Sequence, residues 1–334
     1  MSPASSPDSR LLHHHPNLAP LVRLLAPHLP HALPLYSTLQ TEGVATPVYA
    51  SFACGEEAGP PFLILADMGN QLRFFCSAET SVDLSAAEKA EAEELVVSSL
   101  RWYLREHPRG RPDIRIGAIP DIWTDAVAGA FTKPFYPSNI HYQPLPSIST
   151  VEAGEGSPAL AFPDDVSVLP AEERHIEQIL STSDVPHPPS YILSRLPHTT
   201  TLFATPSADP TLPHFSSSSS TTTRVASSPP TSPSPALIAH CITHRDGSIG
   251  TVFVAPSFRR VGLGAALLKQ RMREMASASA SSAGEDEAGE EEQRFAYCYV
   301  SPANEKSRAL MRRIGMRMTE WCVSWAVVQL PLEE

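Results

Sequence analysis

Apolar positions in the first half of the chain follow two periods, one typical of strands and one of helices. Over residues 85–106, Leu95, Leu100 and Leu104 fall near helical spacing, and Ser85 with Glu88 forms a capping box. A Leu-rich segment at 18–29 predicts another helix, and Asp121 is placed to cap a short helix that follows it. Strands are predicted where β-branched and aromatic residues cluster, at 44–52, 62–67, 72–76 and 114–119.

The second half repeats this alternation. Asp246-Gly247 between two apolar runs is the signature of a primed hairpin turn. Strands are predicted at 166–169, 200–205, 236–243, 249–255, 295–300 and 316–328, and helices at 171–180, 262–275 and 304–314. Strands that alternate with helices predict an α/β (or α+β) fold, with a mixed sheet flanked by helices.

Three segments have compositions typical of disorder. They are the tail at 1–16, a Ser/Thr/Pro tract at 206–235 and a small-residue, acidic run at 276–293. Such tracts bury too little apolar surface to offset the entropy of ordering them. Between 144 and 163 Pro, Ser and Gly cluster, which divides the chain into an N-terminal half at 17–150 and a C-terminal domain at 164–334 that carries both insertions.

Charge, hydropathy and cysteine content indicate which partners and which cellular location to expect. The 334 residues carry a net charge of −11, of which residues 285–292 supply six negative charges, so we expect no nucleic-acid partner. The sequence has neither an apolar run of the ~20 residues that a membrane span needs nor a secretory signal, so we expect no membrane partner. Five cysteines without a C-x-x-C pair predict free thiols, no metal site and a reducing, cytoplasmic location, with a mitochondrial one left open.

The most informative stretch is 252–268. A strand ends at Pro256, a short loop carries Arg259 and Arg260, and Gly262 and Gly264 open an amphipathic helix. Amides at a helix N-terminus bind anions, and glycine lets the backbone approach a phosphate closely. The spacing differs from that of nucleoside-triphosphate loops and of the three-glycine dinucleotide fingerprint. It predicts a pyrophosphate-binding loop; the alternative is a tight strand–helix turn with ordinary surface arginines.

The pattern Arg259-x-x-Gly262-x-Gly264 after a strand resembles the coenzyme A motif of the Gcn5-related N-acetyltransferase (GNAT) superfamily. Residues 299–304, followed by Ser307 and Gly315-Met316, resemble the later strand–helix motif of that superfamily, with Met316 in place of the usual Phe. Within it, the chain looks most like the glycine N-acyltransferase family. Residues 29–36 and 190–197 resemble that family's Leu-Pro…Tyr and Tyr-Ile segments, which implies a degenerate GNAT-like N-terminal half.

The resemblance implies a donor site for acetyl-CoA or another acyl-CoA, without a metal. The pantetheine arm would pair with the strand, the pyrophosphate would lie on the loop, and the cap of the later helix would hold that helix against the donor. An amide near Val254 would stabilise the oxyanion. The residues implied are Phe253, Val254, Ala255, Arg259, Arg260, Val261, Gly262, Leu263, Gly264, Ala265, Asn304 and Ser307.

No general base or acid follows from the resemblance. Ser257 stands where relatives commonly have an acidic residue, and Met311 where many have a Tyr that protonates the leaving thiolate. His240 and Tyr299 are the catalytic candidates, beside the alternatives of an ordinary sheet histidine and a packing tyrosine. Asn304 has the alternative role of a helix cap alone, and Trp321 and Trp325 line either the core or an acceptor pocket.

These features predict an acyl-CoA-dependent N-acyltransferase whose acceptor is a small-molecule amine or an amino acid. Two alternatives remain open, acetylation of a protein amine and a degenerate module that binds coenzyme A or a partner. The oligomeric state does not follow from the sequence.

Overall fold

The computed structural model describes residues 12–42, 46–107, 112–145, 162–205, 235–280 and 293–330. They form a mixed α/β fold in two compact units. The first unit comprises Met1–Pro144, His244–Ser248 and Glu292–Glu334, and the second comprises Leu145–Thr243 and Ile249–Glu291. The chain therefore passes from one unit to the other several times, and each unit is described by itself.

The first unit is built on an eight-stranded sheet with the order β1-β2-β3-β4-β5-β12-β6-β11. Neighbouring strands are antiparallel except β4 and β5, which are parallel. The strands are β1 (His13–His14), β2 (Val48–Ala50), β3 (Leu63–Asp67), β4 (Gln71–Cys76), β5 (Asp113–Pro120), β6 (Phe135–Pro144), β11 (Phe295–Val300) and β12 (Arg317–Gln329).

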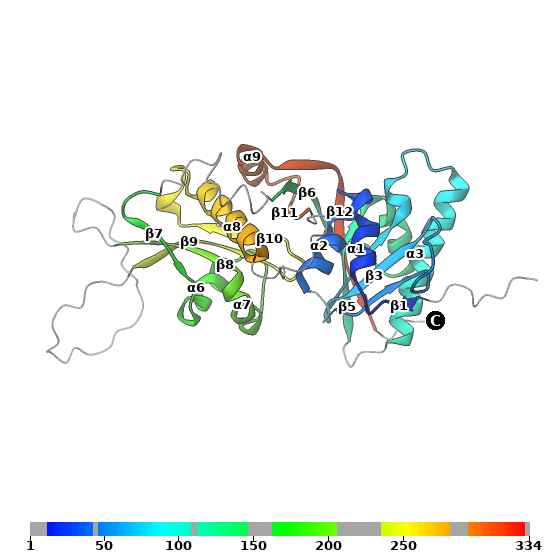
Figure 1. Ribbon diagram of the computed structural model, residues 1–334. Helices are drawn as coiled ribbons and strands as arrows, with labels where there is room; N and C mark the ends of the chain where they lie inside the picture. The colour runs from blue at the N-terminus through cyan, green and yellow to red at the C-terminus, as the bar shows by residue number, and fades with distance from the viewer. Residues whose placement is uncertain are drawn as a thin grey trace, which may run out of the picture. The chain divides into compact units, whose positions relative to one another are not determined.

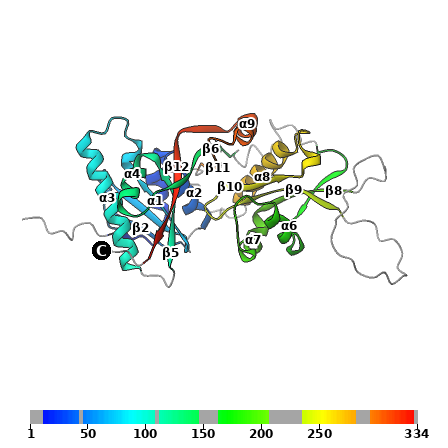
Figure 2. The ribbon, with the colours of Figure 1, turned by 180° about the vertical axis from the view of Figure 1, so that it is seen from behind.

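Helices cover both faces of this sheet (Figures 1 and 2). On one face lie α1 (Ala19–Leu25) and α2 (Leu33–Glu42), and on the other lie α3 (Ala86–Glu106) and α4 (Thr124–Ala130). Strand β3 shows why both faces are apolar. Leu63 and Leu65 pack toward α3, while Ile64 and Ala66 pack toward α1 and α2, because successive strand residues point to opposite faces. The last helix of the unit is α9 (Glu305–Arg313).

The second unit has a four-stranded antiparallel sheet with the order β10-β9-β8-β7. Its strands are β7 (Val166–Pro170), β8 (Thr199–Ala204), β9 (Ala236–Thr243) and β10 (Ile249–Val254). Helices α6 (Ile176–Ser181) and α7 (Pro189–Arg195) cover one face, where Ile179, Ile192 and Ile242 meet in a buried cluster. Helix α8 (Leu263–Ala280) lies on the other face, where its Arg271 binds Thr243 (Figure 1).

Several sequence predictions are confirmed. Helix α3 begins with the predicted capping box, in which Ser85 Oγ accepts from the Glu88 amide at 3.3 Å and Glu88 accepts from the Ser85 amide at 2.9 Å. Strand β11 has the predicted bounds, and Asp246-Gly247 lies in the turn between β9 and β10.

Other predictions are wrong. The tail was expected to extend to residue 16, but His13–His14 pairs with β2, and Leu12 and His15 are buried. Asp121 does not cap α4. It begins a 3-10 turn, and its carboxylate accepts from the Cys322 amide at 3.3 Å. Residues 276–280, placed in an insertion, continue α8.

Elements that the sequence did not predict owe their conformation to tertiary contacts. Strand β6 contains Pro137 and Asn139, which are poor strand formers, but it is paired on both sides, by β11 and β12. Helices α2 and α7 were also missed. The predicted tail at 1–11, the segment at 146–161 and the insertions at 206–234 and 281–292 lie outside the described residues. The division into halves near residue 150 stays a prediction, although the large sheet combines strands from both of them.

Candidate functional site

Strand β10 is an edge strand with a bulge. Among the described strands of its sheet it has one neighbour, β9. The pairing register shifts between Gly250 and Phe253, and Thr251 inside this bulge has φ 50°. A left-handed conformation is uncommon for a β-branched residue. Bulges bend strands and re-aim their groups, and they are frequent next to binding sites.

Beyond the bulge, the open edge of β10 presents backbone groups. The Ala255 amide donates to the Ile238 carbonyl at 2.8 Å, so it points toward β9. Backbone groups of successive strand residues point to opposite sides, so the amide and carbonyl of Val254 are directed away from β9. The Val254 carbonyl accepts from Arg259 Nε at 2.8 Å. The Val254 amide is therefore placed to donate to a group at the open edge.

The loop after β10 has two left-handed residues. It turns through a 3-10 segment at Pro256–Phe258 and reaches α8 by way of Arg260, with φ 70°, and Gly262, with φ 91°. A Cβ at Gly262 would meet no atom within 4 Å, so the space beside this backbone is open. The first amides of α8, at Leu263 and Gly264, point out of the helix because they have no intrahelical acceptor.

The charge of this loop suits an anion. Arg259 and Arg260 are both exposed, and they flank a helix N-terminus that carries a partial positive charge. The residues present fit a phosphate-bearing ligand through open backbone at Gly262, outward amides and two cations. A non-glycine residue held in a left-handed conformation, as Arg260 is, recurs at ligand clamps.

Helix α8 is fixed to the sheet behind this loop. Leu263, Leu267 and Leu268 are buried. Further along the helix, Arg271 Nε donates to Thr243 Oγ1 at 2.7 Å. Arg271 Nη1 also lies 3.1 Å from Glu274 Oε2, and this carboxylate oxygen accepts from a threonine hydroxyl of β8 as well. These contacts hold the helix N-terminus and its amides in place.

His240 lies within the second unit, on the sheet face that α6 covers. Its ring is fully buried, its Nε2 is 2.8 Å from Thr182 Oγ1, and it stacks on Phe253 with centroids 5.5 Å apart. Burial lowers its pKa to about 4, and a hydrogen bond with the Thr251 backbone offsets part of that effect. The ring is thus neutral at pH 7 and sits behind the bulge of β10.

Asn304 and Ser307 meet at the start of α9 in the first unit. Asn304 Oδ1 accepts from the Ser307 amide at 3.1 Å, which is a helix N-cap. Asn304 is exposed, so its side chain also faces solvent. Met311, at the position of the usual acid, is 3% exposed and packs on the buried side of the helix.

Tyr299 also lies in the first unit, and it is half-buried. Its hydroxyl donates to Asp246 Oδ2 at 3.4 Å, and its ring meets Trp325 edge-on with centroids 5.0 Å apart. Burial, together with the negative charge of Asp246, raises the pKa of Tyr299, so the hydroxyl keeps its proton at neutral pH. Trp321 is half-buried as well, and it stacks on His31 at 3.7 Å.

The predicted residues thus fall into two groups. The second unit brings together β10, the arginine–glycine loop, the start of α8 and His240, while Tyr299, Asn304 and Ser307 belong to the first unit. The sequence reasoning missed Arg73 and gave Asp246 only a turn role. The structure joins them in a buried ion pair with a distance of 2.6 Å. Their separation along the chain left no local signal of this pair.

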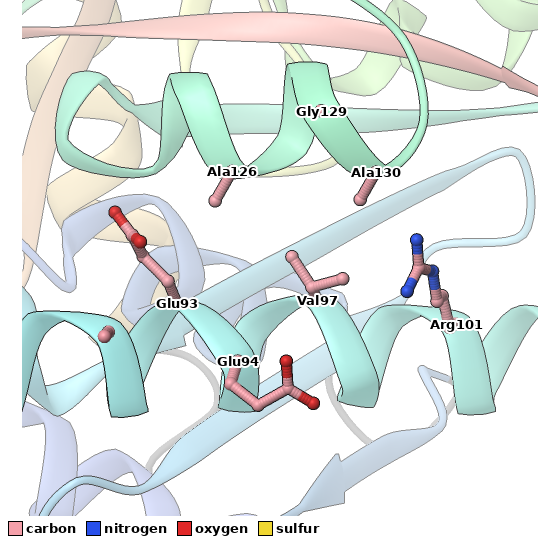
Figure 3. Close-up of a pocket in the computed structure, with 8 residues that line it drawn as sticks. Glu93, Glu94, Val97, Arg101, Ala126, Gly129 and Ala130 are labelled. Carbon is pink, nitrogen blue, oxygen red and sulfur yellow. The ribbon is translucent and has the colours of Figure 1, made fainter.

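A pocket of about 260 Å³ lies between α3 and α4 (Figure 3). Small side chains such as Ala126 and Ala130 leave the space, and Glu93, Val97 and Arg101 of α3 point into it. It contains none of the predicted site residues. In the described part of the chain there is no group of three metal-ligating side chains, and no described helix is long and apolar enough to cross a membrane.

Comparisons with known proteins bear on the region that holds the loop. Residues 232–326 match the family model of FR47-like proteins. No curated protein matches the sequence. The X-ray structure of a Drosophila protein is 15% identical, covers 96% of this chain and 99% of its own, and superposes with a TM-score of 0.58. This chain therefore shares its fold over nearly its whole length.

Two further solved structures are more distant. A tandem GNAT protein from the clavulanic acid biosynthesis pathway is 14% identical over 94% of each chain, with a TM-score of 0.44. A GCN5-related N-acetyltransferase from Sphaerobacter thermophilus is 13% identical over 99% of each chain, with a TM-score of 0.45. The family match covers the segment that contains the arginine–glycine loop and the Asn304 motif.

Proposed function

We propose that this protein is an N-acyltransferase that takes an acyl group from acetyl-CoA or another acyl-CoA. The observation that carries the proposal is the left-handed, open backbone at Gly262, which joins a bulged edge strand to a helix N-terminus beside two exposed arginines. A pyrophosphate needs such a cradle of amides and cations. The match of residues 232–326 to FR47-like proteins covers this loop and supports the proposal.

The chain's own groups would divide the work as follows. Amides from Arg260 to Gly264, with the charges of Arg259 and Arg260, would hold the pyrophosphate. The Ala265 amide, which the sequence also suggested, donates instead to the Gly262 carbonyl at 3.0 Å. The open edge of β10 at Phe253, Val254 and Ala255 receives the pantetheine arm. The outward Val254 amide donates to the thioester oxygen as that oxygen gains negative charge, and such donors act strongly away from water.

The reaction joins an amine nitrogen to the thioester carbon, breaks the carbon–sulfur bond and releases the thiol of coenzyme A. The ammonium form of the acceptor must first lose a proton. His240 was a candidate for this base, but its ring is buried behind β10 and hydrogen-bonded to Thr182. We therefore propose that His240 supports the bulge and that water takes the proton. Tyr299, whose pKa is raised, is a poor donor to a thiolate.

For the acceptor we propose a small-molecule amine or an amino acid, on the resemblance to glycine N-acyltransferases at residues 29–36 and 190–197. One observation favours a second function, a module that binds coenzyme A without turnover. Ser257 and the buried Met311 occupy the positions of the usual acidic residue and acid. A thiolate is a good leaving group, which favours turnover even without a protein acid.

Thiol release from acetyl-CoA and longer acyl-CoA donors, measured with a panel of small amines and amino acids, tests the proposal. We expect amine-dependent thiol release in the wild type. Arg259→Ala should raise KM for the donor about ten-fold, equivalent to about 1.4 kcal/mol for a charge-assisted contact to phosphate. Arg105→Ala, at an exposed arginine of α3, is the control and should behave as the wild type. Coenzyme A binding without amine-dependent release would support the second function instead.

A further inference from the structure

The turn between β9 and β10, residues His244–Ser248, is grouped with the first unit although both strands belong to the second. The turn is closed by bonds from the His244 amide to the Ser248 carbonyl, at 2.8 Å, and from the Gly247 amide to the His244 carbonyl, at 3.0 Å. Gly247 has φ 81°, and a Cβ there would come within 2.9 Å of Thr41 Oγ1 on α2. The turn is therefore tightly enclosed.

A buried ion pair connects this turn to the large sheet. Arg73 Nη2 of β4 donates to Asp246 Oδ2 at 2.6 Å, and the two side chains are 4% and 6% exposed. The other carboxylate oxygen of Asp246 accepts from the Ser248 amide at 3.0 Å and from the Ser248 hydroxyl at 2.6 Å. The carboxylate is thus bonded on both oxygens: one accepts from a strand of the large sheet, and the other accepts two bonds from its own turn.

Two tyrosines of β11 complete the enclosure. The Tyr297 hydroxyl donates to the backbone carbonyl of Asp246 at 2.5 Å, and the Tyr299 hydroxyl reaches Asp246 Oδ2 at 3.4 Å. The Arg73 guanidinium lies 5.8 Å from the centroid of the Tyr299 ring. The backbone of Asp246 is therefore fixed by β11, and its side chain by β4 and β11 together.

The neighbouring strand leaves room for the guanidinium. A Cβ at Gly117 of β5 would overlap Arg73 Nη1, at 1.7 Å. Gly117 therefore provides the space in which the ion pair forms. Burial alone would raise the pKa of Asp246. The charges of Arg73 and His244 and the hydrogen bonds from Ser248 and Arg73 together outweigh it and hold that pKa below its ordinary value, so the carboxylate is ionised.

We propose that Arg73 is a positioning residue for acyl-CoA binding, because its pair with Asp246 fixes the turn from which β10 starts. Ser248 continues directly into Ile249, the first residue of the bulged edge strand. A displaced turn would change the path of β10 and the direction of the Val254 amide. The inference rests on the proposed function, since β10 is the proposed donor strand. It gives the N-terminal half a role in donor binding.

The test compares Arg73→Met, Asp246→Asn and the double variant Arg73→Met/Asp246→Leu, with Arg105→Gln as the control at an exposed ion pair. The double variant leaves no buried charge without a partner, so it keeps the test usable if the single variants fail to fold. Two quantities are measured in the full chain. They are the dissociation constant of coenzyme A by calorimetry and the hydrogen exchange of the amides at 249–254.

We expect the double variant to bind coenzyme A about ten-fold more weakly and to exchange faster at 249–254, with exchange at 263–275 unchanged. The control should match the wild type in both. If the double variant keeps the wild-type affinity and protection, the pair only neutralises charge and the inference is wrong.

The exchange measurement separates this inference from the proposed function. If the wild type binds no coenzyme A, the proposed function fails. Faster exchange at 249–254 in the double variant would then still support positioning of β10, and unchanged exchange would overturn it.

Discussion

Arg260 and Gly262 hold left-handed backbone conformations two residues apart, and they differ in what this costs. A left-handed backbone conformation costs a non-glycine residue about 1–2 kcal/mol, whereas glycine adopts it without this cost. Arg260 keeps φ 70° at an exposed position. Backbone strain retained at such a position is typical of ligand clamps, which supports the assignment of this loop to phosphate binding.

His240 gives a residue-scale prediction about pH. Its pKa is about 4 in the folded chain and 6.5 in the unfolded one. Between these values the unfolded chain binds more protons, so stability falls as the pH drops below 6.5 and levels off below about 4. We expect His240→Gln, whose amide can still bond to Thr182, to remove about 2 kcal/mol of the loss between pH 7 and 4.5.

Denaturant unfolding of both proteins at a series of pH values measures this difference. The rate gives a second readout. If His240 were the general base, kcat/KM would fall with an acid limb near pH 4, and His240→Gln would lose about 10²–10⁴-fold in rate. Our account instead expects the variant to keep the pH dependence of kcat/KM and to lose donor affinity through the bulge.

At the scale of elements, two helices begin with side-chain caps, and only one of these caps belongs to the predicted donor site. Ser85 caps α3, and Asn304 caps α9. Loss of such a cap costs about 1 kcal/mol of stability. We expect Ser85→Ala and Asn304→Ala to lower the melting temperature to a similar extent. If Asn304 also holds α9 against the donor, only Asn304→Ala weakens binding of coenzyme A. Equal affinities in the two variants would leave Asn304 with the role of a cap alone.

The sequence predicted those elements whose signals are local. The capping box at Ser85, the turn at Asp246-Gly247 and the loop through Gly262 each depend on residues within a few positions. Strand β6 and helix α2 depend on partners far along the chain, and their own composition does not favour them. Asp121 shows the opposite error, since a good capping residue is used instead to accept from the Cys322 amide. The Arg73–Asp246 pair joins residues 173 positions apart, which no pattern could reveal.

At the scale of the whole molecule, the units do not follow the order of the chain. The FR47-like match at residues 232–326 includes β9, β10 and α8 of the second unit and β11, α9 and most of β12 of the first. The matched segment thus contributes elements to both units. Deletion of the N-terminal half would remove five strands of the large sheet that contains β11 and β12. The N-terminal half is therefore expected to be needed for folding as well as for positioning the turn.

The central claim is that the loop through Gly262 binds the pyrophosphate of coenzyme A, and calorimetry with coenzyme A tests it most directly. The comparison is the wild type, Gly262→Val and Gly55→Val. Gly55 has φ 85° and open space around it, so its variant carries the same backbone strain at a glycine that is not part of the loop. We predict one-site binding in the wild type and in Gly55→Val, and a loss of about a hundred-fold in Gly262→Val, equivalent to about 2.8 kcal/mol. Unchanged affinity in a folded Gly262→Val variant would contradict the account.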